Sequence, residues 1–256
     1  MANKVLASEL LGLALEIAQR AGELLMQRPL TFEVTSKSVA IDIATQMDHD
    51  SERLIVNSLL AARPDDGIIG EEGSARDTSS GITWVIDPVD GTVNYLYGLP
   101  GWSVSIAAKD DDGILVGVVH APTIGSTWTA TRGGGAFFNG NSIRCNEPVS
   151  LDRALIGTGF VYDVSMRAHQ GKVVSNLLPL VRDIRRMGSA AVDICNVAMG
   201  AYDGYFEIGL KEWDLAAAHL IACESGALIS TDAGDLTCCA GPSLYPVLVQ
   251  VLEAGR

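Results

Sequence analysis

The sequence predicts an α/β protein of the α+β kind, and three patterns along its 256 residues lead to this prediction. Apolar side chains recur at helical spacing over residues 4–27 and 46–62. Residues 81–150 are divided into short β-rich stretches by turn residues, which is typical of an antiparallel sheet. After residue 150, strand and helix patterns alternate, which indicates a second, mixed sheet in the C-terminal half.

The first expected helix covers residues 4–27 and ends before Pro29. Charged residues such as Glu16 and Arg20 lie between its apolar positions, which is unlike a signal peptide or a membrane span. We therefore expect a cytoplasmic protein.

The second expected helix, residues 46–62, has a start signal of its own. Thr45 is followed three residues later by Asp48, and this spacing resembles a capping box. A capping box would give Asp48 a purely structural role, which is the alternative to a catalytic one.

Five short stretches of the β-rich region are expected to be strands, and Asn139-Gly140 is typical of a hairpin turn between two strands. The triple glycine at 133–135 could suggest a phosphate-binding loop, but no Gly-Lys-Ser/Thr follows it, which favours a β-turn. The expected strands are 82–86, 102–109, 114–120, 126–131 and 136–138.

In the C-terminal half, strands are expected at 154–159, 184–187 and 201–208, and helices at 166–180, 189–199 and 214–225. No Pro-, Gly- or Ser-rich tether separates the two halves of the chain. We therefore expect two closely packed regions, residues 1–147 and 148–256.

Composition narrows the class of partner. Hydrophobic residues make up 48% of the chain, which is enough for a substantial core. The formal net charge is −13, and no run of Lys or Arg is present, so nucleic acid is not an expected partner. The overall negative field repels anions, and an anionic substrate would have to be met by bound cations or by local amides.

Cysteine and histidine usage gives no sign of a zinc site or of a disulfide framework. The cysteines are odd in number and contain no Cys-x-x-Cys pair, so we expect buried, reduced thiols. The histidines show no ligand spacing, which makes Zn²⁺ a poor match. These residues are Cys145, Cys195, Cys223, Cys238 and Cys239, with His49, His120, His169 and His219.

Four carboxylates are the candidate metal ligands. The apolar run 84–86 indicates a buried strand that carries Asp87 to its end, with Asp90 three residues later. Gly91 then permits a tight turn whose backbone N–H groups are free to face an anion. Carboxylates without His or Cys suit Mg²⁺. The four are Glu71, Asp87, Asp90 and Asp214, and Asp214 could alternatively N-cap a helix over 215–223.

Taken together, these motifs resemble the inositol monophosphatase family of Mg²⁺-dependent, lithium-sensitive phosphatases. The similar segments are Lys37, Asp42–Asp48, Gly70-Glu71-Glu72, residues 84–95 and Trp213–Gly226. The resemblance implies a layered α/β/α/β/α sandwich of the sugar-phosphatase type. It also implies a homodimer.

The same resemblance implies a site for two or three Mg²⁺ ions. The metal ligands would be Glu71, Asp87, the carbonyl of Val89, Asp90 and Asp214. One ion would lower the pKa of a water that attacks phosphorus in line, and a second would stabilise the leaving alkoxide.

Roles for the remaining site residues come from the resemblance as well. Glu71 and Thr92 would orient or deprotonate the attacking water. Asp48 would lie beside Thr92 and support it, in addition to capping the helix. The amides of Gly91 and Thr92 would hold the phosphate. The alcohol half of the substrate would contact Asp90, the backbone of Ala190, and Glu207. The alternative for Glu207 is that it is an exposed strand residue without a role in binding.

The expected function is therefore a hydrolase of inositol monophosphate or of a similar small polyol or sugar phosphate. Fructose-1,6-bisphosphatase, histidinol-phosphate phosphatase and phosphoadenosine-phosphate 3′-phosphatase are the alternatives within the enzyme class. A regulatory partner of the transcription machinery and a metal-dependent scaffold are the alternatives outside it. Arg185 and Arg186 could reach a second substrate phosphate or a partner subunit, or could be solvated surface residues.

Overall fold

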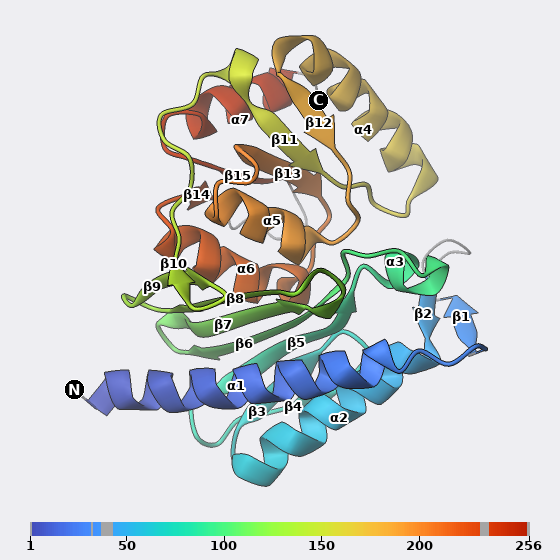
Figure 1. Ribbon diagram of the computed structural model, residues 1–256, viewed down its shortest axis with the longest axis vertical. Coiled ribbons are helices and arrows are strands. Elements are labelled where there is room, and N and C mark those ends of the chain that lie inside the picture. Colours follow the sequence, from blue (N-terminus) through green and yellow to red (C-terminus); the bar gives the residue numbers. More distant parts are fainter. Residues whose placement is uncertain (1, 32, 37–42, 231–235, 255–256) are drawn as a thin grey trace.

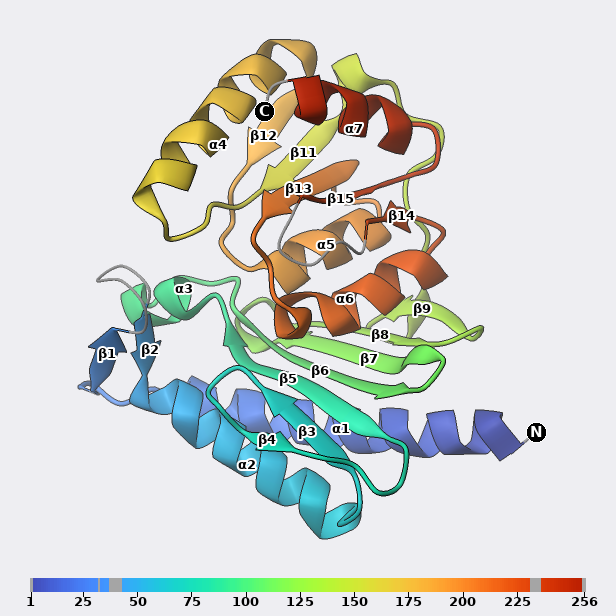
Figure 2. The same cartoon turned by 180° about the vertical axis from the view of Figure 1, so that it is seen from behind.

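A computed structural model describes residues 2–31, 33–36, 43–230 and 236–254. The chain forms five layers, in which helices and sheets alternate (Figure 1, Figure 2). This arrangement confirms the predicted α/β/α/β/α sandwich. The helices of the three helical layers are α1 (Ala2–Met26) with α2 (Gln46–Ala62), α5 (Ala190–Ala198) with α6 (Glu212–Glu224), and α4 (Val164–Leu177) with α7 (Tyr245–Ala254).

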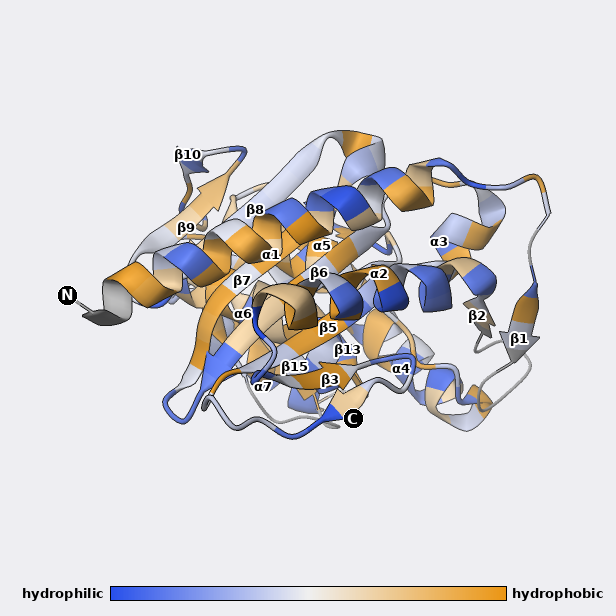
Figure 3. Ribbon diagram, turned by 90° about the horizontal axis from the view of Figure 1, so that it is seen from below, coloured by the Kyte–Doolittle hydropathy of each residue, from blue (hydrophilic) through white to orange (hydrophobic). Residues whose placement is uncertain are grey.

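Helix α1 covers the outer face of the first sheet. Leu10, Ile17 and Leu25 lie on one side of the helix and are fully buried, as helical spacing predicts. Figure 3 shows polar and apolar residues alternating along this helix. Burial of each such side chain contributes about 1.5–3 kcal/mol. Among the described helices none is both long and apolar enough to cross a membrane.

The first sheet has eight strands in the order β10-β9-β8-β7-β6-β5-β3-β4. Neighbours are antiparallel, as expected, apart from the β3–β5 pair, which is parallel, with Ile68 opposite Trp84. The strands are β3 (Gly67–Gly70), β4 (Ala75–Arg76), β5 (Thr83–Asp90), β6 (Ser103–Asp110), β7 (Gly113–Ala121), β8 (Ser126–Thr131), β9 (Gly135–Phe138) and β10 (Asn141–Ser142).

Strand β5 is covered on both faces, which explains its continuous apolar run. Trp84 and Ile86 pack into the core beneath α1 and α2, whereas Val85 packs into the core beneath α5 and α6. The strand therefore holds a fixed position in the middle of the fold. It also continues to Asp90, beyond the predicted end at residue 86.

The second sheet is mixed, as predicted, with the strand order β12-β11-β13-β15-β14. Strands β12, β11 and β13 are parallel, and β15 is antiparallel to both of its neighbours. The strands are β11 (Leu155–Thr158), β12 (Asp183–Arg185), β13 (Gly204–Ile208), β14 (Leu228–Ile229) and β15 (Leu236–Ala240). Strand β15 and helix α7 were not predicted, and the predicted elements have ends shifted by a few residues.

Helix α6 lies close against the first sheet because small residues face it there. A Cβ atom on Gly117 would stand 2.7 Å from the carbonyl oxygen of Ala217, so only glycine permits this approach. Ala217 and Ile221 share one core with Val119 of the sheet. This packing fixes the start of α6, and thus Asp214, relative to the first sheet. The domain division at residue 147 stays a prediction.

Gly133 and Gly134 lie in the turn between β8 and β9, and Gly135 is the first residue of β9, which agrees with the predicted β-turn. The backbone N–H groups of Gly133 and Gly135 donate to the two carboxylate oxygens of Glu224, at 2.7 and 2.8 Å. The amides of this turn do bind an anion, but that anion is a side chain of the same protein.

A small two-stranded sheet and a short helix lie outside the main layers. Strands β1 (Val34–Ser36) and β2 (Ile43–Thr45) form a two-stranded sheet, and Lys37 and Asp42 lie outside the described residues. Helix α3 (Thr92–Tyr97) follows β5.

All five cysteines are free. Cys223, near the end of α6, is exposed, so the expectation of buried thiols is wrong for that residue.

Candidate active site

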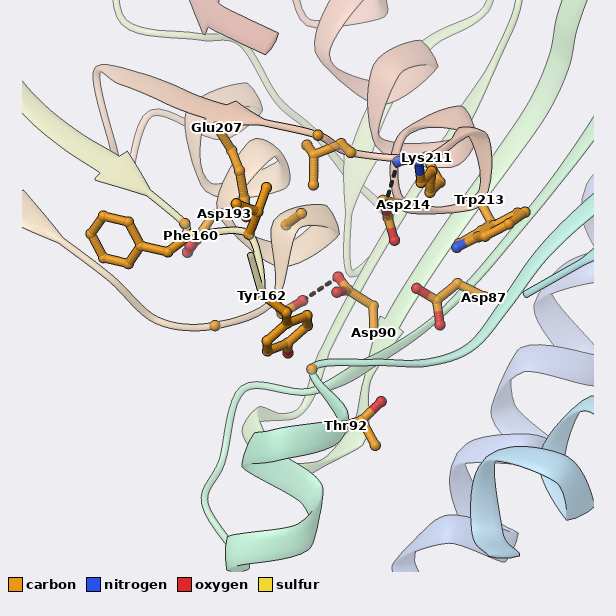
Figure 4. Close-up of a pocket in the computed structure, with 18 of the residues that line it drawn as sticks. Asp87, Asp90, Thr92, Phe160, Tyr162, Asp193, Glu207, Lys211, Trp213 and Asp214 are labelled. Atoms are coloured by element: carbon orange, nitrogen blue, oxygen red, sulfur yellow. Dashed lines mark hydrogen bonds between the residues drawn. The ribbon is translucent and has the colours of Figure 1, made fainter. Parts of the chain in front are cut away.

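A cavity of about 310 Å³ lies where the end of β5 meets the C-terminal half of the chain. All four predicted carboxylates line it. Asp87 and Asp90 come from β5, Glu71 from the turn after β3, and Asp214 from the first turn of α6. Figure 4 shows Asp87, Asp90 and Asp214 facing a common space. The structure therefore brings together residues that lie far apart in the sequence.

A bulge in β5 places Asp87 and Asp90 on the same side of the strand. Residues three apart normally face opposite sides of a sheet. Here Asp87 pairs with Ser105 and Asp90 pairs with Ser103, so β5 holds one residue more than β6 across this stretch. Pro88 has no N–H to donate to the ladder, which is consistent with the irregularity. The carboxylate of Asp87 accepts a hydrogen bond from the Val89 N–H at 3.0 Å.

Asp87 is almost completely buried, and this burial raises the pKa of its carboxyl well above the ordinary value. The negative charges of Glu71, Asp90 and Asp214 raise that pKa further. Each effect penalises the ionised form, and a cation among these groups would remove the penalty.

Asp90 connects the two halves of the chain. Its Oδ2 atom accepts hydrogen bonds from the Ser189 hydroxyl at 2.5 Å and from the Ala191 N–H at 2.8 Å, both at the start of α5. Burial raises the pKa of Asp90, and these two hydrogen bonds act in the opposite direction. Ser189 also caps α5 by accepting from the Val192 N–H.

Asp214 is the third residue of α6 and not its N-cap, so the alternative that placed it at the cap is corrected. Helix α6 begins at Glu212, and the Lys211 N–H donates to Asp214 Oδ2 at 2.6 Å. The carboxylate thus closes the first turn and still lines the cavity. Burial raises the pKa of Asp214, and the charge of Asp90 adds to this effect.

Asp48 makes the contacts that both of its predicted roles require. Its Oδ2 atom accepts the Thr45 N–H at 2.8 Å, and its own backbone N–H donates to the Thr45 side chain, which completes the capping box. The Met47 N–H donates to the Thr45 hydroxyl as well. The Oδ1 atom of Asp48 accepts the Thr92 hydroxyl at 2.9 Å. One carboxylate therefore caps α2 and fixes a side chain of the cavity.

The far end of the cavity carries Glu207 of β13. Burial raises the pKa of Glu207 to about 7, although a hydrogen bond from the Tyr205 hydroxyl lowers it in part. A Cβ atom on Gly159 would stand 2.0 Å from Glu207 Oε2, so glycine is needed there to admit the carboxylate. Ala190 also lines the cavity.

The two neighbouring arginines differ in their surroundings. Arg185 is exposed and pairs with Asp183, with 2.6 Å between Nη1 and Oδ2. Arg186 lines the cavity, and its charge lowers the pKa of both Asp90 and Glu207. Only Arg186, of these two, reaches the candidate site.

Asp193 of α5 was missed by the sequence reasoning. It lines the cavity and is almost fully buried, and its Oδ1 atom is the one buried side-chain oxygen or nitrogen without a hydrogen-bond partner in the described part of the chain. Burial and the charges of Asp90 and Glu207 raise the pKa of Asp193 well above its ordinary value. An acidic residue within the apolar helix sequence 190–199 was the available signal.

The lining suits a hard divalent cation. Among the described residues that line the cavity none is His or Cys, and the four carboxylates and the Val89 backbone supply oxygen atoms. Within the described segments, no group of three or more His, Cys, Asp or Glu side chains has an arrangement that could by itself hold a metal ion. The carboxylates thus share a cavity and repel one another there, which is a donor set that fits Mg²⁺ bound together with a substrate.

Comparison with known proteins gives consistent matches. The model of the inositol monophosphatase family matches residues 6–255. The inositol-1-monophosphatase SuhB of Mycobacterium tuberculosis is 40% identical over 235 residues, covering 86% of this chain and 81% of that protein. The Nus factor SuhB of Pasteurella multocida is 40% identical over 225 residues, covering 86% and 84%. The structure of an IMPase from Thermotoga maritima superposes with a TM-score of 0.89 at 31% identity, covering 96% and 97%.

Proposed function

The chain belongs to the inositol monophosphatase family, and from this premise we propose that it is a Mg²⁺-dependent phosphomonoesterase of inositol monophosphate or of a similar small polyol or sugar phosphate. The observation that carries the proposal is the convergence of Glu71, Asp87, Asp90 and Asp214 on one cavity. Carboxylates that raise one another's pKa form a site that bound positive charge would stabilise.

In this proposal Glu71, Asp87, the Val89 carbonyl, Asp90 and Asp214 hold two or three Mg²⁺ ions. When bound, Mg²⁺ supplies positive charge to the phosphate oxygens and lowers the pKa of water. The chain carries a net charge of −13, and such local positive charge is what would draw an anionic substrate into the cavity.

Thr92, supported by Asp48, orients the attacking water. The Thr92 hydroxyl has two acceptors, Asp48 Oδ1 at 2.9 Å and the Val89 carbonyl oxygen at 3.1 Å. Donation to either leaves the lone pairs of Thr92 Oγ1 available to accept a hydrogen bond from water. Asp48 is fully buried and held by Thr45, which keeps this orientation fixed. Glu71 also lines the cavity and orients the same water. The N–H groups of Gly91 and Thr92 hold the phosphate.

The opposite end of the cavity binds the alcohol half of the substrate. Carboxylates accept hydrogen bonds from hydroxyl groups, and Asp90 and Glu207 present such oxygens together with the backbone of Ala190. Asp193 adds an oxygen without a partner at the same end. Several acceptors around one small space suit a polyol with several hydroxyl groups.

Substrates with two phosphates are less well matched. A bisphosphate or a phosphorylated nucleotide needs a second cationic subsite, for which Arg186 is the candidate. The charge of Arg186 already acts on Asp90, Asp193 and Glu207. Because the positive charge of Arg186 is already offset by these carboxylates, the cavity favours a polyol monophosphate over fructose 1,6-bisphosphate or phosphoadenosine phosphate. Histidinol phosphate stays an alternative.

A regulatory function is the second candidate, because a relative of 40% identity is named a Nus factor. The complete set of acidic residues around the cavity supports the phosphatase. A Mg²⁺-binding scaffold without turnover is the third candidate. The homodimer, the lithium sensitivity and the cytoplasmic location that we expect from the sequence belong to the same proposal.

The test is phosphate release from inositol monophosphates, fructose 1,6-bisphosphate, histidinol phosphate and phosphoadenosine phosphate, each with and without Mg²⁺. We expect Mg²⁺-dependent release that is fastest with a polyol monophosphate. The Asp87→Asn protein, purified in the same way, controls for contaminating phosphatases. Absence of release from every substrate with Mg²⁺ present would overturn the proposal and favour a regulatory or scaffold function.

A further inference from the structure

Helix α2 has an unusual buried face. Asp48, Ser51 and Glu52 lie three and four residues apart, so they share one side of the helix. All three are buried, with Glu52 3% exposed. Further along the same side, Ile55 and Leu59 are apolar, as expected for a helix that packs on a sheet. The first two turns thus bury polar groups, and such groups need partners.

The partners belong to three segments of the candidate site. Asp48 accepts the Thr92 hydroxyl at the start of α3. The Ser51 hydroxyl donates to the carbonyl oxygen of Pro88, within the β5 bulge, at 3.2 Å. Glu52 accepts from the turn that carries Glu71. This face of α2 is therefore a common support for the segments that line the metal end of the cavity.

Glu52 makes the most direct of these contacts. Its Oε2 atom accepts the Glu72 N–H at 2.9 Å, and its Oε1 atom accepts the Ser74 N–H at 3.0 Å. Both amides follow Glu71 in the turn between β3 and β4. A Cβ atom on Gly70 would stand 2.6 Å from Glu52 Oε2, so the glycine before Glu71 leaves the space that the carboxylate occupies.

We propose that Glu52 is a positioning residue for Glu71: its carboxylate fixes the turn 70–74 and thereby keeps Glu71 directed at Asp87. The inference rests on the proposed function, in which Glu71 is a metal ligand. On its N-terminal side, Glu71 is fixed by its own N–H, which donates to the carbonyl of Ile86 at 3.2 Å. On its C-terminal side the chain enters the turn between β3 and β4, where the Gly70 N–H donates to the Ser74 carbonyl at 2.7 Å. The two charge-assisted hydrogen bonds to Glu52 hold the amides of Glu72 and Ser74 within this turn.

The chain offers a matched control for this geometry. Glu224 accepts two backbone N–H groups, those of Gly133 and Gly135, with one oxygen for each amide. It lies ten residues beyond Asp214 in α6, which is about 15 Å along a helix axis. A glutamine at either position keeps the side-chain shape but turns one acceptor into a donor that faces an N–H. Only the change at Glu52 alters the support of Glu71.

The experiment measures Mg²⁺ binding by calorimetry, without substrate, for the full chain and for Glu52→Gln and Glu224→Gln. We expect Glu52→Gln to weaken Mg²⁺ binding about tenfold or more, since residues that orient metal ligands have effects of this size. Glu224→Gln should leave Mg²⁺ affinity unchanged, although both changes lower the thermal stability of the metal-free protein. Hydrogen exchange should quicken over residues 70–76 in Glu52→Gln alone.

The outcomes separate this inference from the proposed function. If the unaltered protein binds Mg²⁺ and Glu52→Gln binds it equally well, the positioning role is overturned and the phosphatase proposal stands. If the unaltered protein binds no Mg²⁺, the metal site itself is overturned, and the inference with it. Gly70→Ala displaces the Glu52 carboxylate without removing its charge, and the same weakening of Mg²⁺ binding is expected, so a Glu52→Gln protein that does not fold leaves the inference testable.

Discussion

The two ends of the cavity both bury acidic side chains, but different groups balance the charge at each end. At the metal end, Asp87 and Asp214 have raised pKa values, to which the charges of neighbouring carboxylates contribute. At the alcohol end, Glu207 has a hydrogen bond from the Tyr205 hydroxyl and the positive charge of Arg186 nearby. In the proposed function, cations balance the charge at the metal end. At the alcohol end neighbouring carboxylates also raise the pKa of Asp193, and we expect a hydroxyl group, an arginine and bound protons to balance the charge there.

The two ends are also built differently. The metal end depends on the backbone of a central strand, because the bulge between Asp87 and Asp90 turns both side chains to one side. The alcohol end depends on space left by small residues, since Gly159 admits the Glu207 carboxylate. A substitution at the metal end should therefore change metal binding, and one at the alcohol end should change substrate affinity.

The largest expected effect belongs to Asp87→Asn. The loss of a ligand charge should lower kcat/KM by a factor of about a hundred to a thousand, by analogy with the removal of other groups that stabilise charge at an active site. Mg²⁺ binding should weaken in parallel, as calorimetry can measure. The fold should persist, because a neutral amide relieves the repulsion among Glu71, Asp90 and Asp214.

Asp193→Asn is the matched control for that change, because it also replaces a buried carboxyl at the cavity with an amide. Mg²⁺ affinity should stay within about twofold of the unaltered protein if the two ends are separate in function. Equal loss of Mg²⁺ binding in both variants would contradict the division of the cavity into a metal end and an alcohol end.

A smaller effect is expected for Glu207→Gln. Exchange of the carboxylate for an amide weakens hydrogen bonds to substrate hydroxyls, which should raise KM about tenfold, the size expected for a hydrogen bond to a charged group. The value of kcat and the Mg²⁺ dependence should change little. Steady-state kinetics at saturating Mg²⁺ provide the measurement, and a fall in kcat without a change in KM would place Glu207 in the reaction and not in substrate binding.

Much of this architecture was predictable from local patterns. Helical spacing located α1, and turn residues located most of the strands of the first sheet. Asp87, Asp90 and Thr92 could be chosen as candidates for the metal end because they lie in one short motif that resembles a family. Strand β3 was missed because four residues, two of them glycine, carry too little periodicity.

The supporting residues could not be predicted for a different reason. Ser51 and Glu52 are polar, so hydropathy does not mark them as buried, and only the fold shows that they are buried against the site on the same side of α2 as Ile55 and Leu59. Asp193 and Tyr205 depend on contacts between α5 and β13, which local sequence does not reveal. A role that arises from long-range contacts is visible in sequence only as a polar residue out of place.

The smallest expected effect tests whether protons balance the alcohol end. The pKa of Glu207 is about 7 in the folded protein, raised from an ordinary value of 4.5. The folded state therefore binds a proton more tightly than the unfolded state does. This contribution to stability is fully present below pH 4.5 and is lost as the pH rises to about 7. A shift of this size corresponds to at most roughly 3 kcal/mol.

Urea unfolding of the metal-free protein and of Glu207→Gln, between pH 4.5 and 8, isolates this contribution, because titration of the other groups is common to both proteins. The free energy of unfolding of the unaltered protein, relative to Glu207→Gln, should fall as the pH rises to 7 and then level off. A relative stability that is flat or rises over this range would show that Glu207 is ionised throughout. The alcohol end would then resemble the metal end, with a buried negative charge that a cation or a donor of the substrate must balance.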